Sequence, residues 1–120
     1  MTRVRVVALG DVEKIDLPGG SWSRMVLTDR TLDANASSLG YSEFAPASVT
    51  GLVAHETEEV AYVLTGRGEL RLQDTTVPFE AGQGLFIPAG VWHAVANTGD
   101  ETVRMVFSFP YPDYPPTQRR

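Results

Sequence analysis

The sequence contains no cysteine, and this absence removes several kinds of site at once. A chain without cysteine has no disulfide framework, no thiol nucleophile and no zinc or iron–sulfur centre built on sulfur. Histidine is also scarce, because only His55 and His93 occur in 120 residues. Any metal in this protein must therefore be held by histidine, aspartate or glutamate, and the two histidines are the first candidates.

Long apolar runs and an excess of positive charge are absent as well. No stretch approaches the roughly 18–20 consecutive apolar residues of a membrane span, and no basic segment leads into an apolar one near the N-terminus. The net charge is −5 and the ten basic residues are scattered, which argues against a phosphate-binding stripe or an anchor on anionic lipid. The sequence predicts a cytoplasmic protein that binds neither nucleic acid nor membrane.

Size and composition indicate one globular domain over residues 1–120. The chain is 42% hydrophobic and 21% charged, which is typical of an ordinary globular protein of this length. Residues 110–120 form a proline-rich tail, which is expected to run extended because proline cannot continue a strand ladder. We expect an ordered terminus packed by its tyrosines, with a lid or a dimer contact as the alternatives.

Glycine and proline interrupt the rest of the chain at short intervals, with 11 and 8 residues respectively. The segments between them favour β-structure, and many short strands with Gly/Pro turns predict an all-β sandwich or barrel. Only residues 29–37 are compatible with a helix, and a turn or loop fits them equally well. The expected strands are 3–9, 22–28, 39–44, 60–64, 69–72, 84–87, 92–96 and 102–109.

The second histidine lies in a segment whose local structure is easy to predict. Gly82 fits a turn, residues 85–87 a buried strand, residues 88–90 a tight reversal and residues 91–96 a returning strand. On that strand His93 shares one face with Val91 and Val95. A histidine on an apolar face is either a core residue bonded to a backbone carbonyl or a ligand, and both interpretations stay open at this point.

The first histidine lies just before another strand that begins with a carboxylate. Glu59, Ala61 and Val63 share one face of that strand, so Glu59 is expected to point toward the same side as two small apolar residues. A buried carboxylate is unfavourable unless it is paired or binds a metal. The alternative is that Glu58 and Glu59 simply form a solvated turn.

Together these two segments resemble the two signature motifs of the cupin superfamily, Gly-x5-His-x-His-x3or4-Glu-x6-Gly and Gly-x5-Pro-x-Gly-x2-His-x3-Asn. The second motif, at 82–97, is matched at every fixed position by Gly82, Pro88, Gly90, His93 and Asn97. The first motif, at 47–66, is matched by His55, Glu59 and Gly66. In that register Val53 stands where the family has its first histidine and Ala47 stands where it has glycine.

The resemblance implies a small double-stranded β-helix, also called a jelly-roll barrel. It also implies that His55, Glu59 and His93 bind one divalent transition metal, which is Fe, Mn, Ni, Zn, Cu or Co, and that Glu59 takes part in proton transfer. Because Val53 cannot coordinate, two histidines and one carboxylate remain, and this set leaves coordination positions open for chemistry. A metal site that has been lost is the alternative.

By strand parity, mostly apolar residues are expected around His55, Glu59 and His93. The expected lining is Val53, Ala61, Val63, Val91 and Val95, together with Val103, Met105, Phe107 and Phe109 of the last strand. Such a pocket suits a small, partly apolar organic substrate that is oriented mainly by the metal. The resemblance implies a metal-dependent enzyme with dioxygenase or polyketide-cyclase chemistry. The alternative is a non-catalytic cupin that binds or senses a small ligand at a degenerate metal site.

The N-terminal segment carries the only signal for a partner. In residues 3–8 the side chains of Arg3 and Arg5 alternate with those of Val4 and Val6, so a strand with one apolar face could add to the edge of a sheet. Cupins commonly form dimers through edge strands. We therefore expect a homodimer.

Overall fold

The computed structural model describes residues 3–120 and consists almost entirely of strands. The strands are β1 Ile15–Asp16, β2 Trp22–Leu27, β3 Ser38–Phe44, β4 Val53–His55, β5 Glu59–Thr65, β6 Arg67–Arg71, β7 Thr76–Glu80, β8 Gly84–Ile87, β9 Ala94–Ala96, β10 Val103–Phe109 and β11 Thr117–Arg119. Two short 3-10 turns, η1 Leu9–Asp11 and η2 Pro18–Gly20, precede β1 and β2. No helix in this part of the chain is long and apolar enough to cross a membrane.

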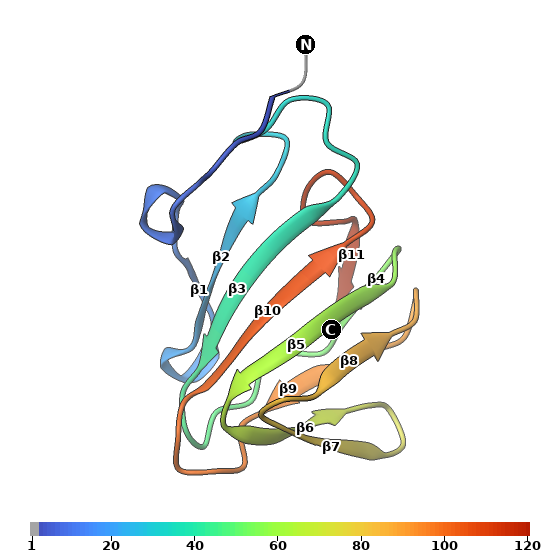
Figure 1. Ribbon diagram of the computed structural model, residues 1–120. Coiled ribbons are helices and arrows are strands. Elements are labelled where there is room, and N and C mark those ends of the chain that lie inside the picture. The colour runs from blue at the N-terminus through green and yellow to red at the C-terminus, as the bar shows by residue number, and fades with distance from the viewer. Residues whose placement is uncertain (1–2) are drawn as a thin grey trace.

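The strands form two layers that enclose the interior of the molecule (Figure 1). One layer is a six-stranded antiparallel sheet in the order β1-β2-β3-β10-β5-β8. The other layer contains β7-β6-β9 and β11-β4, which are linked by isolated bridges from Val49 to Ala96 and from Val53 to His93. This arrangement confirms the prediction of an all-β jelly roll.

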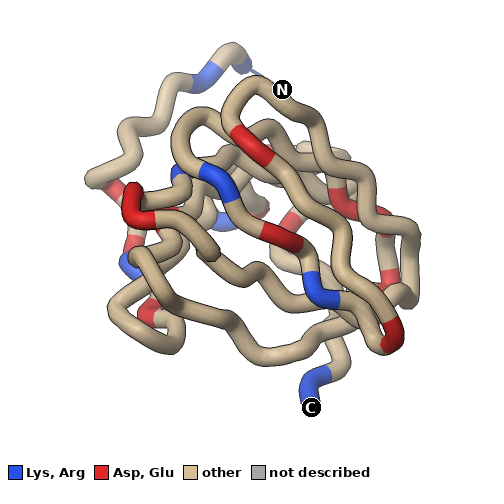
Figure 2. Tube along the Cα trace, turned by 90° about the horizontal axis from the view of Figure 1, so that it is seen from below, with Lys and Arg blue, Asp and Glu red and all other residues tan. Residues whose placement is uncertain are grey.

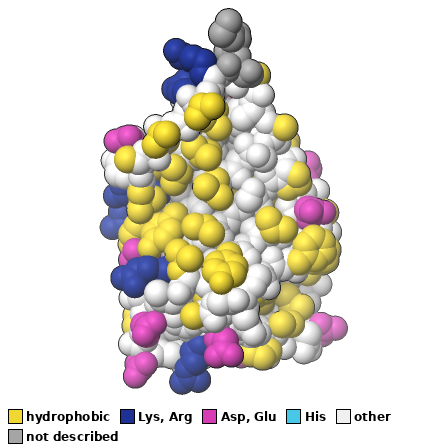
Figure 3. Space-filling model, viewed as in Figure 1, with side chains coloured by type: hydrophobic (Ala, Val, Ile, Leu, Met, Phe, Trp, Pro, Cys, Tyr) yellow, Lys and Arg dark blue, Asp and Glu magenta, His cyan; other side chains and the backbone are white. Residues whose placement is uncertain are grey.

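The core lies between the layers, and β10 contributes buried side chains to it along its whole length. Its residues are alternately buried and partly exposed from Val103 to Phe109, as a strand with one buried face requires. The larger apolar cluster consists of Phe44, Val63, Leu70, Phe79, Ile87, Val103 and Met105. A second cluster contains Met25, Phe107 and Phe109. Among residues 3–120, charged residues of both signs are interspersed without a basic stripe (Figure 2). The face shown in Figure 3 carries both apolar and charged side chains.

The N-terminal strand is a wrong prediction. The expected strand 3–9 is absent, because residues 3–8 pair with no strand within residues 3–120 and Leu9 begins the turn η1. The helix-compatible segment 29–37 is a loop of turns and bends.

Four strands were not predicted. β1 and β4 are very short, and β7 contains Pro78, which an edge strand tolerates. β11 follows the prolines of the tail and pairs with β4, so the chain returns to the sheet instead of only lying extended along it.

Candidate metal centre

Backbone hydrogen bonds hold the two histidine segments side by side. The amides and carbonyls of Val53 and His93 bond to each other in both directions, at 3.0 and 2.9 Å. The amide of Gly90 donates to the carbonyl of His55 at 2.7 Å. Gly90 sits at a positive φ of 77°, a conformation that glycine adopts without strain, so it can close the turn that brings its amide there. The reversal after β8 therefore places His93 beside His55.

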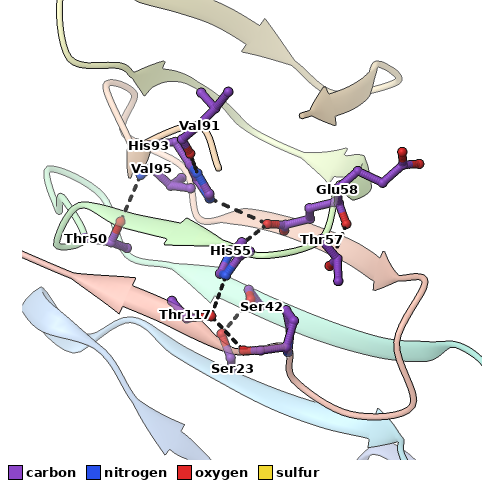
Figure 4. Close-up of polar contacts among 12 residues, drawn as sticks. Ser23, Ser42, Thr50, His55, Thr57, Glu58, Val91, His93, Val95 and Thr117 are labelled. Carbon is purple, nitrogen blue, oxygen red and sulfur yellow. Dashed lines mark hydrogen bonds and ion pairs between the residues drawn. The ribbon is translucent and has the colours of Figure 1, made fainter. Parts of the chain in front are cut away.

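Both imidazole rings point at one carboxylate oxygen (Figure 4). The Nε2 atom of His55 lies 3.2 Å from Oε1 of Glu59, and Nε2 of His93 lies 3.5 Å from the same oxygen. Glu59 opens β5 and pairs with Ile87 of β8, which fixes it on the inner face of the six-stranded sheet. The neighbouring Glu58 points away from the rings in Figure 4.

The site is largely shielded from water. The histidines are 5% and 4% exposed and the side chain of Glu59 is 13% exposed. One alternative is thereby removed, since Glu59 is not on a solvated turn. His93 has the backbone hydrogen bond expected of a core histidine, and its Nε2 atom also faces Glu59. The three residues offer ligand atoms that all lie within 4.8 Å of one another.

The Nδ1 atom of each ring already has a hydrogen-bond partner, and this determines which ring nitrogen is free to bind a metal. Nδ1 of His93 lies 2.9 Å from the carbonyl of Val91, and a carbonyl can only accept, so this nitrogen carries the hydrogen. Nδ1 of His55 lies 2.7 Å from Oγ1 of Thr117, whose own hydroxyl donates to the carbonyl of Pro115 at 2.8 Å. Nδ1 of His55 is therefore a donor as well. In the neutral rings both Nε2 atoms present lone pairs to Glu59.

Three acceptors that converge in this way are suited to share a cation, either a metal ion or a proton. Donors bound to one metal at about 2.1 Å stand about 3.0–3.4 Å apart, for right-angled to tetrahedral geometry. The separations of 3.2 and 3.5 Å from Oε1 of Glu59 are close to this spacing, and all ligand atoms of the set lie within 4.8 Å of one another. Metal-ligating histidines typically donate their second N–H to an oxygen, as both rings do here. The residues present therefore fit a divalent transition metal.

In the metal-free site the three groups interact through their charges. Burial disfavours the charged form of Glu59, but its interactions with His55 and His93 outweigh burial and hold the pKa of this carboxyl below its ordinary value. Burial also opposes the charge on His93, but the interaction with Glu59 and the bond to the Val91 carbonyl prevail and raise the pKa of this imidazole. Both shifts favour the charged forms of Glu59 and His93 when no metal is bound.

The three residues open onto a cavity of about 650 Å³ between the two layers. Of the predicted lining residues, the cavity is bordered by Val53, Ala61, Val95, Met105, Phe107 and Phe109. Val63, Val91 and Val103 do not border it, which corrects that part of the prediction. Val63 and Val103 are fully buried in the core, and Val91 packs against the same core cluster.

Several polar and aromatic residues of the cavity were missed by the sequence reasoning. Ser23 and Ser42 face it and share a hydrogen bond of 2.6 Å between their hydroxyls, from adjacent strands β2 and β3 (Figure 4). Tyr114 of the tail borders it as well, edge-on to His55 at a ring distance of 5.3 Å. Strand parity was the one available signal, because Ser23 shares a face with Met25 and Ser42 shares a face with Phe44. No local pattern marked Tyr114.

The backbone also explains one departure from the first motif. Ala47, which occupies the position of the family's glycine, has a φ of +61°, in the left-handed region that glycine prefers. The turn is therefore kept although the side chain has changed. Val53 lies opposite His93 and borders the cavity, so its side chain stands beside the three candidate ligands.

Residues 40–109, more than half of the chain, match the cupin domain family. The chain belongs to the cupin family. It is similar to the polyketide synthase protein CurC of Streptomyces cyaneus, with 38% identity over 106 residues that cover 88% of this chain and 68% of that protein. It also matches auxin-binding protein 1 of Arabidopsis thaliana, with 33% identity over 107 residues covering 76% of this chain and 54% of that protein.

Among solved structures, this cupin resembles the polyketide cyclase RemF from Streptomyces resistomycificus. The TM-score is 0.80 at 25% sequence identity, and the match covers 98% of this chain and 85% of that chain. The similarity therefore extends well beyond residues 40–109 and includes the N-terminal and C-terminal segments of the fold.

Proposed function

We propose that this cupin is a metal-dependent enzyme that closes rings in a small, partly apolar organic molecule of the polyketide type. The observation that carries the proposal is the convergence of His55, Glu59 and His93 at the wall of a 650 Å³ cavity. Similarity to a polyketide synthase protein and to a polyketide cyclase favours ring closure over dioxygenase chemistry. The reaction is expected in the cytoplasm.

His55, Glu59 and His93 would hold the metal, and as a Lewis acid the metal would polarise a substrate carbonyl. Glu59 is the residue that accepts a proton. Its Oε1 faces both rings, which leaves Oε2 to take a hydrogen from the carbon between two substrate carbonyls. The carbanion attacks a second carbonyl of the same molecule, a carbon–carbon bond forms, and the proton returns to the new alkoxide. No oxidant is consumed.

The cavity walls supply orientation and exclude water. Phe107, Phe109 and Tyr114 form an aromatic wall with ring distances of 5.7 and 5.6 Å between neighbours. Such a wall suits a planar substrate, and the Ser23–Ser42 pair offers one hydroxyl hydrogen that is not used between them. Both features hold a flexible polyketone in a folded shape that brings the reacting carbons together.

The test is turnover of a synthetic poly-β-ketone by protein loaded with Fe(II), Mn(II), Ni(II) or Zn(II). Ring closure is expected to give a cyclic product of the same mass as the substrate, in the absence of O₂, and His93→Ala should abolish it. A product that carries ¹⁸O from ¹⁸O₂ would instead support the dioxygenase branch and overturn the proposal.

A second candidate function is ligand binding without catalysis. Val53 motivates it, because the position beside His93 has lost a donor, and similarity to an auxin-binding protein adds to it. If the poly-β-ketone raises the melting temperature but is not converted by any loaded form, this second function is supported and ring closure is refuted.

A further inference from the structure

We propose that Thr117, in the C-terminal strand β11, is the positioning residue that prepares His55 to bind metal. The inference rests on the metal centre described above. Thr117 lies outside the region that matches the cupin domain family, which ends at residue 109. Its role is to fix both the orientation of the imidazole ring and the position of its hydrogen.

The hydrogen-bond chain gives Thr117 this role. The carbonyl of Pro115 can only accept, so it takes the hydroxyl hydrogen of Thr117 at 2.8 Å. The oxygen of Thr117 then accepts from Nδ1 of His55 at 2.7 Å, and Nε2 is left as the ligand atom. A ring with its hydrogen on Nε2 could not bind a metal through that atom.

Strand pairing and aromatic packing hold Thr117 in place. Thr117 pairs with His55 across the β11–β4 ladder, and the amide of Glu56 donates to the carbonyl of Pro116 at 3.0 Å. The ring of Tyr114 packs edge-on against His55 at 5.3 Å. The tail therefore completes the surroundings of His55 from the side opposite to Glu59, and the chain segment after residue 109 is part of the metal centre.

The experiment compares Zn(II) affinity, measured by calorimetry, in Thr117→Val, Thr117→Ser and the wild type. The valine variant keeps the shape but removes the acceptor, so binding should weaken about 10–100-fold, the usual range for an outer-shell partner of a histidine ligand. Serine keeps the hydroxyl and should restore wild-type affinity. Gln118→Ala, in the same strand and exposed, is the matched control and should leave affinity unchanged.

A second readout separates positioning from a general structural role. In the Zn(II)-bound protein the Nδ1 hydrogen of His55 should give a slowly exchanging, low-field proton resonance in the wild type and in Thr117→Ser. It should disappear in Thr117→Val. Equal affinity and an unchanged resonance in the valine variant would overturn the proposal. Neither measurement depends on turnover, so failure of the ring-closing function is distinguishable from failure of this inference.

Discussion

Replacement of Gly40 by alanine should destabilise the protein because the ring of Phe107 lies directly over it. Gly40 in β3 pairs with Phe107 in β10, and a Cβ added at Gly40 would stand 2.2 Å from Cζ, 2.6 Å from Cε2 and 2.8 Å from Cε1 of that ring. Ordinary contacts begin at 3.4 Å, so the ring must retreat by about 1 Å. It can do so only into the cavity or against Phe109.

The expected magnitude follows from two opposing effects. Overpacking a well-filled core costs about 1–3 kcal/mol, and removing a glycine from the unfolded chain returns about 0.4–1 kcal/mol. The free energy of unfolding should therefore fall by about 1–2 kcal/mol. At about 2.1 cal/mol/K of unfolding entropy per residue, a chain of this length loses about 4 °C of Tm per kcal/mol, so Tm should fall by about 4–8 °C.

Thermal and urea unfolding of the metal-free protein measure this loss, and Gly84→Ala serves as the control. Gly84 is also a strand glycine, in β8, but its nearest neighbour to an added Cβ is the carbonyl oxygen of Ala61 at 3.8 Å. The control should be neutral or slightly stabilised. Equal Tm values for the Gly40 and Gly84 variants would refute the packing of Phe107 described here.

Three further predictions concern the metal centre. The folded-state pKa of Glu59 lies below 4.5 and that of His93 above 6.5. The stability that this pair contributes is therefore fully present between pH 4.5 and pH 6.5, the ordinary pKa values of the two groups. It is lost as pH rises through the folded-state pKa of His93 or falls through the folded-state pKa of Glu59. Melting curves across pH in metal-free buffer check this, and a flat profile would contradict it. Glu59→Gln should lower Zn(II) affinity more than the roughly 10–100-fold of an outer-shell change, whereas Glu58→Gln, with the same change of charge outside the site, should not lower it. Val53→His should tighten Zn(II) binding in calorimetry, because Val53 stands opposite His93; unchanged affinity would show that it does not face the metal.

Local sequence patterns were enough to predict the part of the site that depends on short-range geometry. Glycine and proline at fixed positions define the reversal at 88–90, and strand alternation then puts His93 and Val95 on the inner face. The inward direction of Glu59 followed from the same alternation in β5. The family motif added what alternation alone cannot give, namely that the two segments meet.

The missed parts depend on contacts between distant segments. Thr117 and His55 are 62 residues apart, and nothing near Thr117 marks it as a hydrogen-bond partner. Val63 and Val103 have the right strand parity but lie too deep in the core to reach the cavity, because parity gives the face of a strand and not the depth. Val91 is only partly buried and packs against the core cluster instead of bordering the cavity. Residues 3–9 have a strand-like pattern but no partner strand within residues 3–120, so the pattern alone predicted the wrong local structure.

The most direct test of the metal centre is anomalous diffraction at the zinc edge from crystals of protein loaded with Zn(II). The account predicts one strong peak per chain, at about 2.0–2.2 Å from Nε2 of His55, Nε2 of His93 and Oε1 of Glu59. The peak should vanish in crystals of His93→Ala. A wild-type map without a peak between these three atoms, or a peak that persists in the alanine variant, would contradict the account.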